Sequence, residues 1–420
     1  MKEGLEFSNP GFKQIEDFVP YNESIIWQIS NDYYQQKGLL AWSDKNPKII
    51  PHKSGSNYQN ALNIIKILKK LQQQFHPQKK IKFLECGAGS GRFSRHLLLA
   101  ARDEGFIDNL ELYVSDFSEK NLDEIKSRKI LSDINDVQEG VHYHYLLLDI
   151  TRAKSQSTFD FIFLHFVFDA LKLTILQKNS NQEFKELYVS SSLRNDIQFS
   201  VIDNVFLQAR LQKDFQWKDY EIDKQSELEK KFFPELLEFS KSKEPYKEIF
   251  YMYSALEAMQ NLISMLDPCG LIFSSDIKPH QEKNYIIVGN ALAHEVDNNF
   301  LTIAFPKTYN FILNDDKISR VVISPSRQVI ETIKENFQSY YGPQNTIQEY
   351  IELESQISNQ IEHNDTTNLK QKSEKLFKYA PYNAYSLDLI AKANLILGNK
   401  KNSNYFQNFA KSIDYWEDLD

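Results

Sequence analysis

Short apolar runs alternate with helically spaced apolar residues from about residue 80 to residue 165 of this chain. The apolar runs predict strands, and the stretches between them predict helices. We expect the strands at residues 81–86, 110–115, 143–148 and 159–164, and the helices at residues 92–101 and 119–128. Strands that alternate with helices at this interval predict an α/β fold with a doubly wound, mostly parallel sheet.

The pattern predicts helices on both sides of this region. Residues 1–75 predict a helical N-terminal cap, whose last helix begins at Ser56 or Asn57. Residues 76–325 form the predicted main domain, interrupted by a charged and aromatic helical insertion at residues 195–250. Its continuation is expected as a helix at residues 254–266, a turn at 267–270, and strands at 271–275, 285–288 and 301–305.

The predicted third part, residues 326–420, is a C-terminal helical domain. Residues 366–413 predict a helix pair around Pro381 that resembles a single tetratricopeptide-like (TPR-like) unit. Because a repeat solenoid needs about three units to be stable, the alternative is a helical hairpin that packs on the main domain.

Composition narrows the classes of function. The 420 residues include 49 basic and 57 acidic side chains, which gives a formal charge of −8. Proteins that bind nucleic acid through its phosphates are usually basic, so no nucleic-acid partner is expected. Residues 1–20 lack a signal-peptide core, and no apolar run is long enough for a transmembrane helix, so we expect a cytoplasmic protein with no membrane partner. The sequence does not predict the oligomeric state.

A glycine-rich turn follows the strand at residues 81–86. Residues 85–91 read Glu-Cys-Gly-Ala-Gly-Ser-Gly and precede a predicted helix. Glycines permit positive φ angles and let a ligand approach the backbone, and the helix start offers N–H groups to an anionic group. The turn therefore predicts a nucleotide-type cofactor site.

Three carboxylates follow three successive predicted strands. Glu85 lies two positions before the first glycine, Asp116 follows the second strand, and Asp149 follows the third. The carboxyl ends of parallel strands meet at one edge of a sheet, and a carboxylate in the place of Asp116 is suited to the ribose hydroxyls. A nicotinamide dehydrogenase is the main alternative, but the glycines follow Gly-x-Gly-x-Gly and not Gly-x-Gly-x-x-Gly.

The turn and its carboxylates resemble motif I and the following motifs of class I S-adenosylmethionine (SAM)-dependent methyltransferases. The resemblance implies a seven-stranded methyltransferase sheet and SAM as cofactor. It implies that Glu85 holds the methionine end of SAM and that Asp149 meets the adenine amino group. The implied cofactor-binding residues are Glu85, Gly87, Gly89, Gly91, Asp116, Phe117, Asp149 and Ile150.

Residues 80–300 also resemble the MidA-like methyltransferases, which are associated with arginine methylation on protein substrates. Residues 166–171, Phe-Val-Phe-Asp-Ala-Leu, stand where that family has an aromatic-Phe-Asp-Ala-Leu segment, and residues 186–189 stand where it has its next strand. Two positions depart from the family. His165 and its neighbours replace an Asn-Glu pair, and residues 275–277 read Ser-Asp-Ile where the family has Asp-Tyr-Gly. Both departures concern the substrate and leave the cofactor site unchanged.

Two residues after the fourth strand are candidate catalytic groups. His165 could act as a base near neutral pH, or could pack and hydrogen-bond locally. Asp169 could hold a cationic acceptor such as a guanidinium group, or could cap the following helix. His142 and His144 are too isolated from other candidate ligands to predict a metal site.

The function predicted from these features is methyl transfer to a protein or peptide side chain, with arginine as the acceptor implied by the resemblance. A small-molecule methyltransferase and a SAM-binding assembly factor with little turnover are the alternatives. Residues 51–57 and the insertion at 195–250 are expected to roof the site, with Ser54, Ser56 and Tyr58 near the methionine end of SAM. The alternative is that both segments pack on the far side of the sheet.

Overall fold

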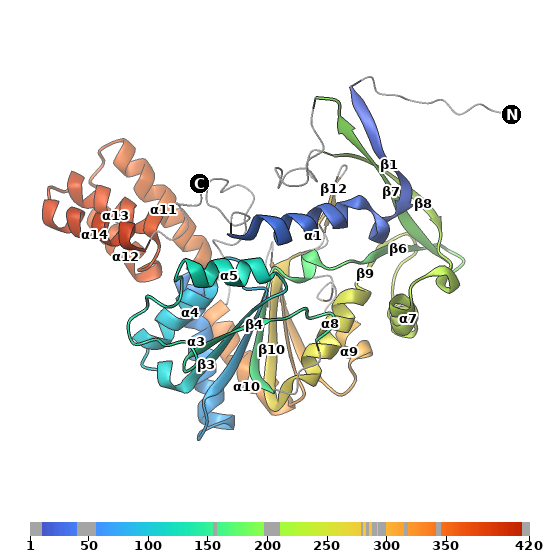
Figure 1. Cartoon of the computed structure of the whole chain (residues 1–420), viewed down its shortest axis with the longest axis horizontal. Coiled ribbons are helices and arrows are strands. Elements are labelled where there is room, and N and C mark those ends of the chain that lie inside the picture. Colours follow the sequence, from blue (N-terminus) through green and yellow to red (C-terminus); the bar gives the residue numbers. More distant parts are fainter. Residues whose placement is uncertain are drawn as a thin grey trace. The chain divides into compact units, whose positions relative to one another are not determined.

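The computed structural model describes residues 11–39, 56–153, 158–196, 211–278, 280–282, 285–287, 292, 300–314, 318–341 and 346–413. The chain divides into two compact units, whose helices and strands are drawn in Figure 1. The first unit contains Met1–Lys37, Asp149–Thr158 and Leu164–Arg327, and the second contains Gly38–Leu148, Phe159–Phe163 and Gln328–Asp420.

The fold is α/β, with a mixed seven-stranded sheet in the order β13-β14-β10-β5-β2-β3-β4. Strand β2 pairs parallel with β3, and β3 pairs parallel with β4, whereas β14 pairs antiparallel with both β10 and β13. The predicted count of seven strands is confirmed, but a mostly parallel sheet is not. The strands are β2 (Ile81–Cys86), β3 (Leu110–Asp116), β4 (Tyr143–Leu147), β5 (Phe159–His165), β10 (Leu266–Ile277), β13 (Tyr309–Asn314) and β14 (Ile318–Ser324).

Aromatic packing fixes the first helix after the glycine turn to the sheet in the second unit. Helix α4 (Arg92–Asp103) carries Phe93, whose ring stacks on Phe163 of β5 with centroids 4.3 Å apart. Phe83 of β2 stacks in turn on Phe161 at 5.0 Å. These rings are almost fully buried, so the contact removes a large apolar surface from water and holds the turn at the end of β2.

Two other helices of this unit begin at side-chain caps. Helix α3 (Tyr58–Phe75) begins after Asn57, whose side chain accepts a hydrogen bond from the Asn60 N–H at 2.8 Å, which confirms the predicted start. Helix α5 (Glu119–Ser127) begins after Ser118, which caps Asn121 in the same way. A short 3₁₀ helix, η3 (Ile107–Asn109), leads into β3.

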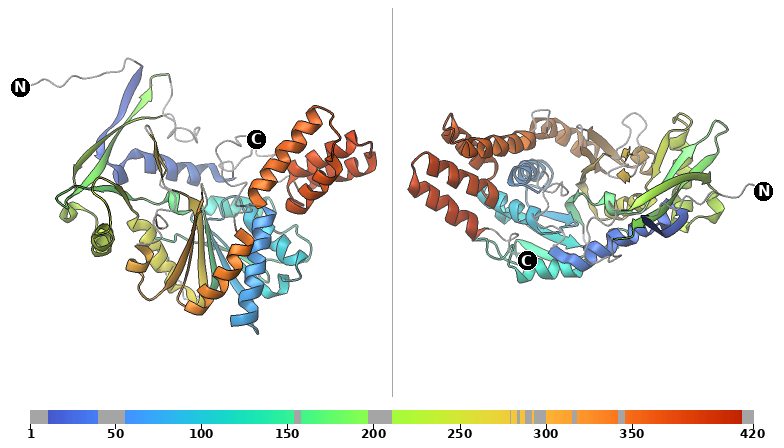
Figure 2. Two further views of the ribbon diagram at one scale, coloured as in Figure 1. Left: turned by 180° about the vertical axis from the view of Figure 1, so that it is seen from behind. Right: turned by 90° about the horizontal axis from the view of Figure 1, so that it is seen from above.

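The first unit contains a second sheet, in which β1 and β8 both pair antiparallel with β7 (Figure 2). This sheet has the order β1-β7-β6-β9, with β8 also paired to β7. Its strands are β1 (Phe12–Pro20), β6 (Thr174–Lys178), β7 (Phe184–Arg194), β8 (Gln212–Asp219) and β9 (Glu248–Tyr251). The insertion is therefore not purely helical, since it carries β8 and β9 as well as helix α7 (Glu227–Ser240).

Three further expectations differ from the structure. Residues 12–20 of the predicted helical cap form β1, because they pair with β7. By contrast, the strand expected at residues 186–189 is present, as part of β7 in the second sheet. Residues 300–304, near the strand predicted at 301–305, form helix α9, and Phe300 stacks on Phe239 of α7 at 4.8 Å. The predicted turn at 267–270 lies within β10.

The remaining elements of the first unit are short or helical. They are η1 (Tyr21–Glu23), α1 (Ile25–Lys37), η4 (Phe168–Ala170), η5 (Ile222–Lys224), α8 (Tyr253–Ser264), β11 (His280–Glu282), β12 (Tyr285–Ile287) and α9 (Phe300–Ala304). Helix α10 (Arg327–Tyr341) follows β14. Among the described residues, no helix is both long enough and apolar enough to span a bilayer.

The C-terminal helices of the second unit are α11 (Thr346–Glu362), α12 (Leu369–Tyr379), α13 (Ala384–Ile396) and α14 (Lys400–Ser412). The prediction of a helix pair at 366–413 is wrong, because this segment forms three helices, α12, α13 and α14. Gly398, at φ 77°, ends α13, and α14 begins two residues later. The loop after α12 docks on the end of α4. The Tyr382 hydroxyl donates to Asp103 at 2.7 Å and accepts from Arg102 at 3.0 Å. This docking favours helices that pack on the main domain over an independent repeat.

Candidate functional site

The turn between β2 and α4 requires glycine at three positions. The φ angles of Gly87, Gly89 and Gly91 are 73°, 54° and 72°, in the left-handed region that other residues rarely adopt. The Ala88 N–H donates to the Ser115 carbonyl at 2.8 Å, which ties the turn to β3. Helix α4 begins at Arg92, after the N-cap residue Gly91, which has no side chain to cap it, so the first N–H groups of the helix are suited to an anionic ligand group.

Glu85 is a buried carboxyl at the end of β2. Glu85 is 4% exposed, and its carboxyl group accepts a hydrogen bond from the Ser94 hydroxyl of α4. Burial raises the pKa of Glu85 from 4.5 to about 8; the Ser94 hydrogen bond opposes this rise, and the charge of Asp116 adds to it. A cationic ligand group at Glu85 would reverse the shift, because it would stabilise the carboxylate.

Asp116 is equally buried but is bound on both oxygens. Its Oδ2 accepts the Gly89 N–H at 2.9 Å, and its Oδ1 accepts the Ser118 N–H at 2.9 Å and the Asn121 amide at 3.3 Å. Burial raises the pKa of Asp116, and these hydrogen bonds act against the rise. The Phe117 N–H is a further backbone donor to this carboxylate, so the turn occupies most of its acceptor positions. Asp116 therefore shapes the glycine turn, a role that sequence reasoning missed.

The Phe117 side chain, next to Asp116, is 40% exposed. Its contact with the cofactor stays a prediction. The geometry of the second unit fits SAM in three respects: a glycine turn with positive φ angles, an uncapped helix start and a buried carboxyl beside it.

Asp149 and Ile150 belong to the first unit. Asp149 Oδ1 accepts hydrogen bonds from the Thr151 N–H at 2.9 Å and from its hydroxyl at 2.6 Å, which makes a tight turn after β4. The Ile150 side chain is buried, and its carbonyl accepts from the side-chain amide of Asn261 in α8 at 3.1 Å. Asn261, which sequence reasoning missed, thus holds this segment in place. The predicted adenine contacts remain untested.

Asp169 lies in a turn that a second carboxylate organises. This turn, η4, follows β5, and the Asp169 N–H donates to Asp276 Oδ2 at 3.1 Å. Asp276, at the end of β10, also accepts the Ile277 N–H at 2.7 Å and a backbone hydrogen bond from Phe168. The sequence marked residues 275–277 only as a departure from the family, so the role of Asp276 was missed.

Burial raises the pKa of both carboxyl groups. Burial raises the pKa of Asp169 to about 6, and it raises the pKa of Asp276 together with the charge of Asp169. Tyr34 of α1 lies near both groups, since their charges help burial to raise the pKa of its phenol. Such a pair favours a cation beside it, because a cation would relieve the repulsion between the two carboxylates.

His165, the other predicted catalytic residue, is half-buried at the end of β5. Its ring meets Phe166 edge-on with centroids 4.2 Å apart. Phe166 has a φ of 53°, which is uncommon for a side chain of this size and marks a sharp turn out of the strand. The ring contact favours local packing for His165, and a role as base stays a prediction.

The segment before α3 is tied to α4 through a histidine. The His96 ring Nδ1 lies 2.6 Å from the Ser56 carbonyl, and burial lowers the pKa of His96 to about 4, so the ring is neutral and donates. Tyr58 donates its hydroxyl to Asp103 at 2.8 Å. Ser54 and residues 197–210 of the insertion lie outside the described residues, and the predicted roof over the site stays a prediction.

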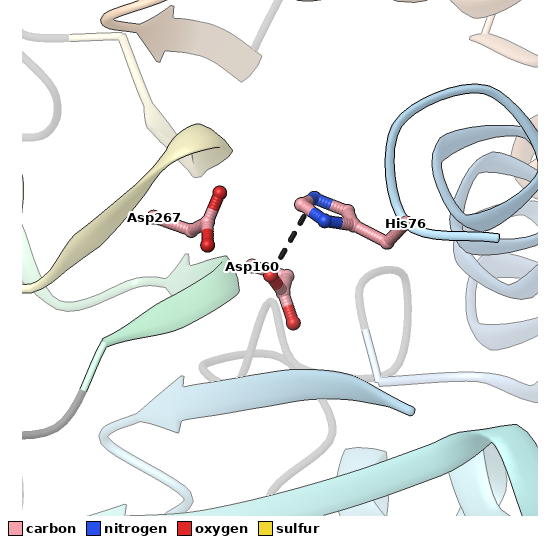
Figure 3. Close-up of side chains that lie close together, drawn as sticks. All are labelled: His76, Asp160 and Asp267. Carbon is pink, nitrogen blue, oxygen red and sulfur yellow. Dashed lines mark ion pairs between the residues drawn. The ribbon is translucent and has the colours of Figure 1, made fainter. Parts of the chain in front are cut away.

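Two other histidines of the second unit, His76 and His144, have acidic neighbours. His76 ends α3 and points toward Asp160, with 3.5 Å between Nε2 and Oδ1 (Figure 3). Asp160 also accepts the Lys79 ammonium at 2.7 Å and the Lys82 backbone N–H at 2.9 Å. The contacts of Asp160 therefore have a structural explanation, because they connect the end of α3 with β2 and β5. His144 pairs with Glu111 at 3.1 Å, on neighbouring strands.

Comparison with known families identifies the class of this site. Residues 62–299, more than half of the chain, match the family described as "Putative S-adenosyl-L-methionine-dependent methyltransferase". The chain belongs to this family. It is a SAM-dependent methyltransferase, and its cofactor is SAM, as the glycine turn predicted. A search of curated proteins finds no match.

Solved structures resemble this methyltransferase only weakly. One, from Burkholderia thailandensis, was crystallised with S-adenosyl-homocysteine bound. It shares 12% identity over 86% of this chain and 84% of its own, with a TM-score of 0.43. The N-methyltransferase NodS from Bradyrhizobium japonicum WM9, in complex with S-adenosyl-L-homocysteine, shares 10% identity over 71% of this chain and 98% of its own, with a TM-score of 0.30.

Proposed function

We propose that this methyltransferase transfers the methyl group to a cationic side chain of a protein or peptide, with arginine as the favoured acceptor. The observation that carries the proposal is the carboxylate pair Asp169 and Asp276, with Tyr34 beside it. A guanidinium group is planar, carries a positive charge and offers several N–H donors. It therefore binds carboxylates more strongly than a neutral methyl acceptor would. The resemblance to the MidA-like methyltransferases favours the same acceptor.

On the cofactor side, we propose that Glu85 holds the ammonium group of SAM and that Asp116 meets the ribose hydroxyls. The turn at Gly87–Gly91 would receive the carboxylate of SAM at the start of α4. When bound, SAM supplies an electrophilic methyl group. Phe117, Asp149 and Ile150 are proposed to contact the adenine.

On the acceptor side, Asp169 is the group proposed to bind the guanidinium, and Asp276 is proposed to position it. Above pH 6 the Asp169 carboxyl is mainly ionised, since its pKa is raised only to about 6. The pair therefore attracts a cation most strongly at neutral and higher pH. His165 remains a candidate for the group that takes the proton from the acceptor.

The test uses the purified full chain and SAM with an isotopically labelled methyl group. Peptide libraries that contain arginine, lysine or neither are offered as acceptors, and the products are located by mass spectrometry. We expect label on arginine with the wild-type chain, and a loss of at least about 10-fold with Asp169→Asn at unchanged SAM affinity. Label on uncharged residues, or equal labelling by the variant, would reject the proposal.

A further inference from the structure

Buried polar side chains meet beneath α7 in the first unit, away from the glycine turn in the sequence. Thr174 of β6 donates to Glu229 of α7 at 2.7 Å. The Asn22 amide of η1 donates to Thr174 at 3.0 Å, to the Tyr253 hydroxyl at 3.3 Å and to Glu229 at 3.4 Å. The segment before α1, the second sheet, α7 and α8 therefore share one polar cluster.

Glu229 is the saturated member of this cluster. Its Oε1 accepts from Thr174 and Asn22, and its Oε2 accepts from the Ser226 N–H at 3.3 Å and the Ser226 hydroxyl at 2.9 Å. All four acceptor positions of the carboxylate are thus in use. Glu229 fixes the start of α7 and contributes negative charge, but it has no position left for another ligand.

Glu186 of β7 is the unsaturated member. It is 1% exposed, and its Oε1 has no hydrogen-bond partner among the described residues. The same holds, within the described part of the chain, for the Asn22 carbonyl oxygen and the Tyr220 hydroxyl. Buried polar atoms without partners are rare, so these three oxygens call for an explanation.

Tyr220 and Glu186 lie on the side of the sheet that faces α7. The Tyr220 N–H donates to the Phe184 carbonyl at 3.0 Å, which places it beside the start of β7. The Tyr220 and Phe184 rings both lie 6.2 Å from Phe233, one turn of α7 beyond Glu229. The phenol therefore shares a side of α7 with Glu229, and its pKa is raised by burial and by the charges of Glu229 and Glu186.

Within the described part of the chain, the charges that act on Glu186 are the negative ones of Glu229 and Glu23. Burial raises its pKa to about 7, the charges of Glu229 and Glu23 add to the rise, and a Gln225 hydrogen bond opposes it. Lys218 stands opposite Glu186 in the pairing with β8, but its Nζ lies 4.0 Å from the centre of the Tyr188 ring. A buried carboxylate without a counter-charge is unfavourable, so it takes up either a proton or a cation.

We propose that Glu186, Asn22 and Tyr220 form a binding site for one hard divalent cation, such as Ca²⁺ or Mg²⁺. The free atoms are a carboxylate oxygen, an amide oxygen and a phenol oxygen, and oxygen ligands of this kind suit such cations. Glu229 supplies a second negative charge nearby. The site ties η1, β7 and the end of β8 together, and it is independent of methyl transfer.

The experiment measures thermal unfolding and calorimetric binding of the chelator-treated full chain at pH 8, with Ca²⁺ or Mg²⁺ at millimolar concentration. We expect one cation per chain and a midpoint rise of a few degrees, because the cation binds only the folded state. Glu186→Gln should abolish both effects. The matched control is Glu227→Gln, a substitution in the first turn of α7 at a side chain that is 91% exposed, and it should respond like the wild type.

A second variant and a pH series protect the test against misfolding of Glu186→Gln. Tyr220→Phe removes one ligand without creating a buried charge, and it should weaken the cation affinity several-fold. The cation affinity of the wild type should also fall from pH 8 to pH 6, because protons compete with the cation for Glu186. The other titratable groups that face this cluster are Glu23, Glu229, Tyr188 and Tyr253. No response of the wild type to either cation at pH 8, or an equal response of Glu186→Gln, would overturn the proposal and leave a buried water as the explanation of the three oxygens.

Discussion

The cofactor side and the acceptor side each contain two buried carboxyl groups, but they are built in opposite ways. Glu85 and Asp116 follow neighbouring parallel strands, and a short turn connects them through the Gly89 N–H. Asp169 and Asp276 come from segments 107 residues apart in sequence, and they meet because β10 ends beside the turn after β5. The first pair can be read from a local motif, whereas the second exists only in the folded chain.

Within each pair, one carboxyl group has more hydrogen-bond donors than the other. Asp116 and Asp276 each accept backbone N–H groups on both sides and act as scaffolds. Glu85 and Asp169 have fewer hydrogen bonds, and their pKa values are raised to about 8 and about 6. One carboxyl in each pair thus fixes the backbone, and the other is available to a cationic ligand group. Variants of each member test this division.

The largest effect is expected for Gly89→Val. A β-branched side chain is strained at a φ of 54°, and it would occupy the space where the cofactor approaches the turn. We expect a loss of SAM affinity of at least about 100-fold by calorimetry, equivalent to about 2.7 kcal/mol. Gly140→Val is the matched control, because Gly140 also has a positive φ, of 79°, but open space around it. An intact fold with unchanged SAM affinity in Gly89→Val would contradict the assignment of the turn.

Glu85→Gln should have the next largest effect and should change binding and stability in opposite directions. Loss of the charge should weaken SAM binding by about 1.5–3 kcal/mol. The folded pKa is raised from 4.5 to about 8, so the stability contributed by protonated Glu85 is present below pH 4.5 and is lost as the pH rises to 8. Glu85→Gln should therefore unfold at a higher temperature than the ligand-free wild type at pH 8.

The pH dependence of the wild type gives an independent check on Glu85. Protonated Glu85 cannot hold an ammonium group, so SAM affinity should fall as the pH decreases from 8 to 6, and binding should release a proton near pH 7. Calorimetry in buffers with different ionisation enthalpies measures this release. A flat pH profile in the wild type, matching that of Glu85→Gln, would show that Glu85 does not meet the ammonium.

Asp276→Asn tests the scaffold of the acceptor side. The Asn side chain replaces a carboxyl oxygen that accepts from the backbone N–H groups of Phe168 and Asp169. These two backbone N–H groups should therefore exchange hydrogen about 10-fold faster, in keeping with about 1.5 kcal/mol for such a bond. SAM affinity should not change. Asp149→Asn is the control, because it should speed exchange at Thr151 and leave the turn after β5 as it is. Equal exchange at Phe168 and Asp169 in both variants would remove the scaffold role.

Local signals in the sequence predicted much of the second unit. The boundaries of β2, β3, α4 and α5 agree with the pattern to within about two residues, since glycine turns, caps and apolar runs act at short range. The start of α3 at Asn57 follows the same logic. These signals depend on neighbours along the chain, which one sequence displays directly.

Pairings between distant segments were not predictable. Strand β1 has an irregular burial pattern, and it is a strand only because it pairs with β7, with two register shifts. Helix α9 contains β-branched residues that favour a strand, yet Phe300 packs on Phe239 as part of a helix. The role of Asp276 belongs to the same class, because nothing near it in the sequence names Asp169 as its partner.

The smallest effect is expected for Ser94→Ala, a substitution in the first turn of α4. The Ser94 hydroxyl donates to Glu85 and lowers its pKa against the effect of burial. Its removal should raise the pKa of Glu85 further, so the loss of SAM affinity on acidification should begin at a higher pH, with a change of only a few-fold at pH 8. The matched variant Asn121→Ala removes a hydrogen bond to Asp116 at 3.3 Å and should leave the pH profile unchanged, because Asp116 keeps its backbone donors. If Asn121→Ala shifted the profile and Ser94→Ala did not, Asp116 and not Glu85 would be the carboxyl that responds to the cofactor, and the division between scaffold and ligand carboxyl would be reversed on this side.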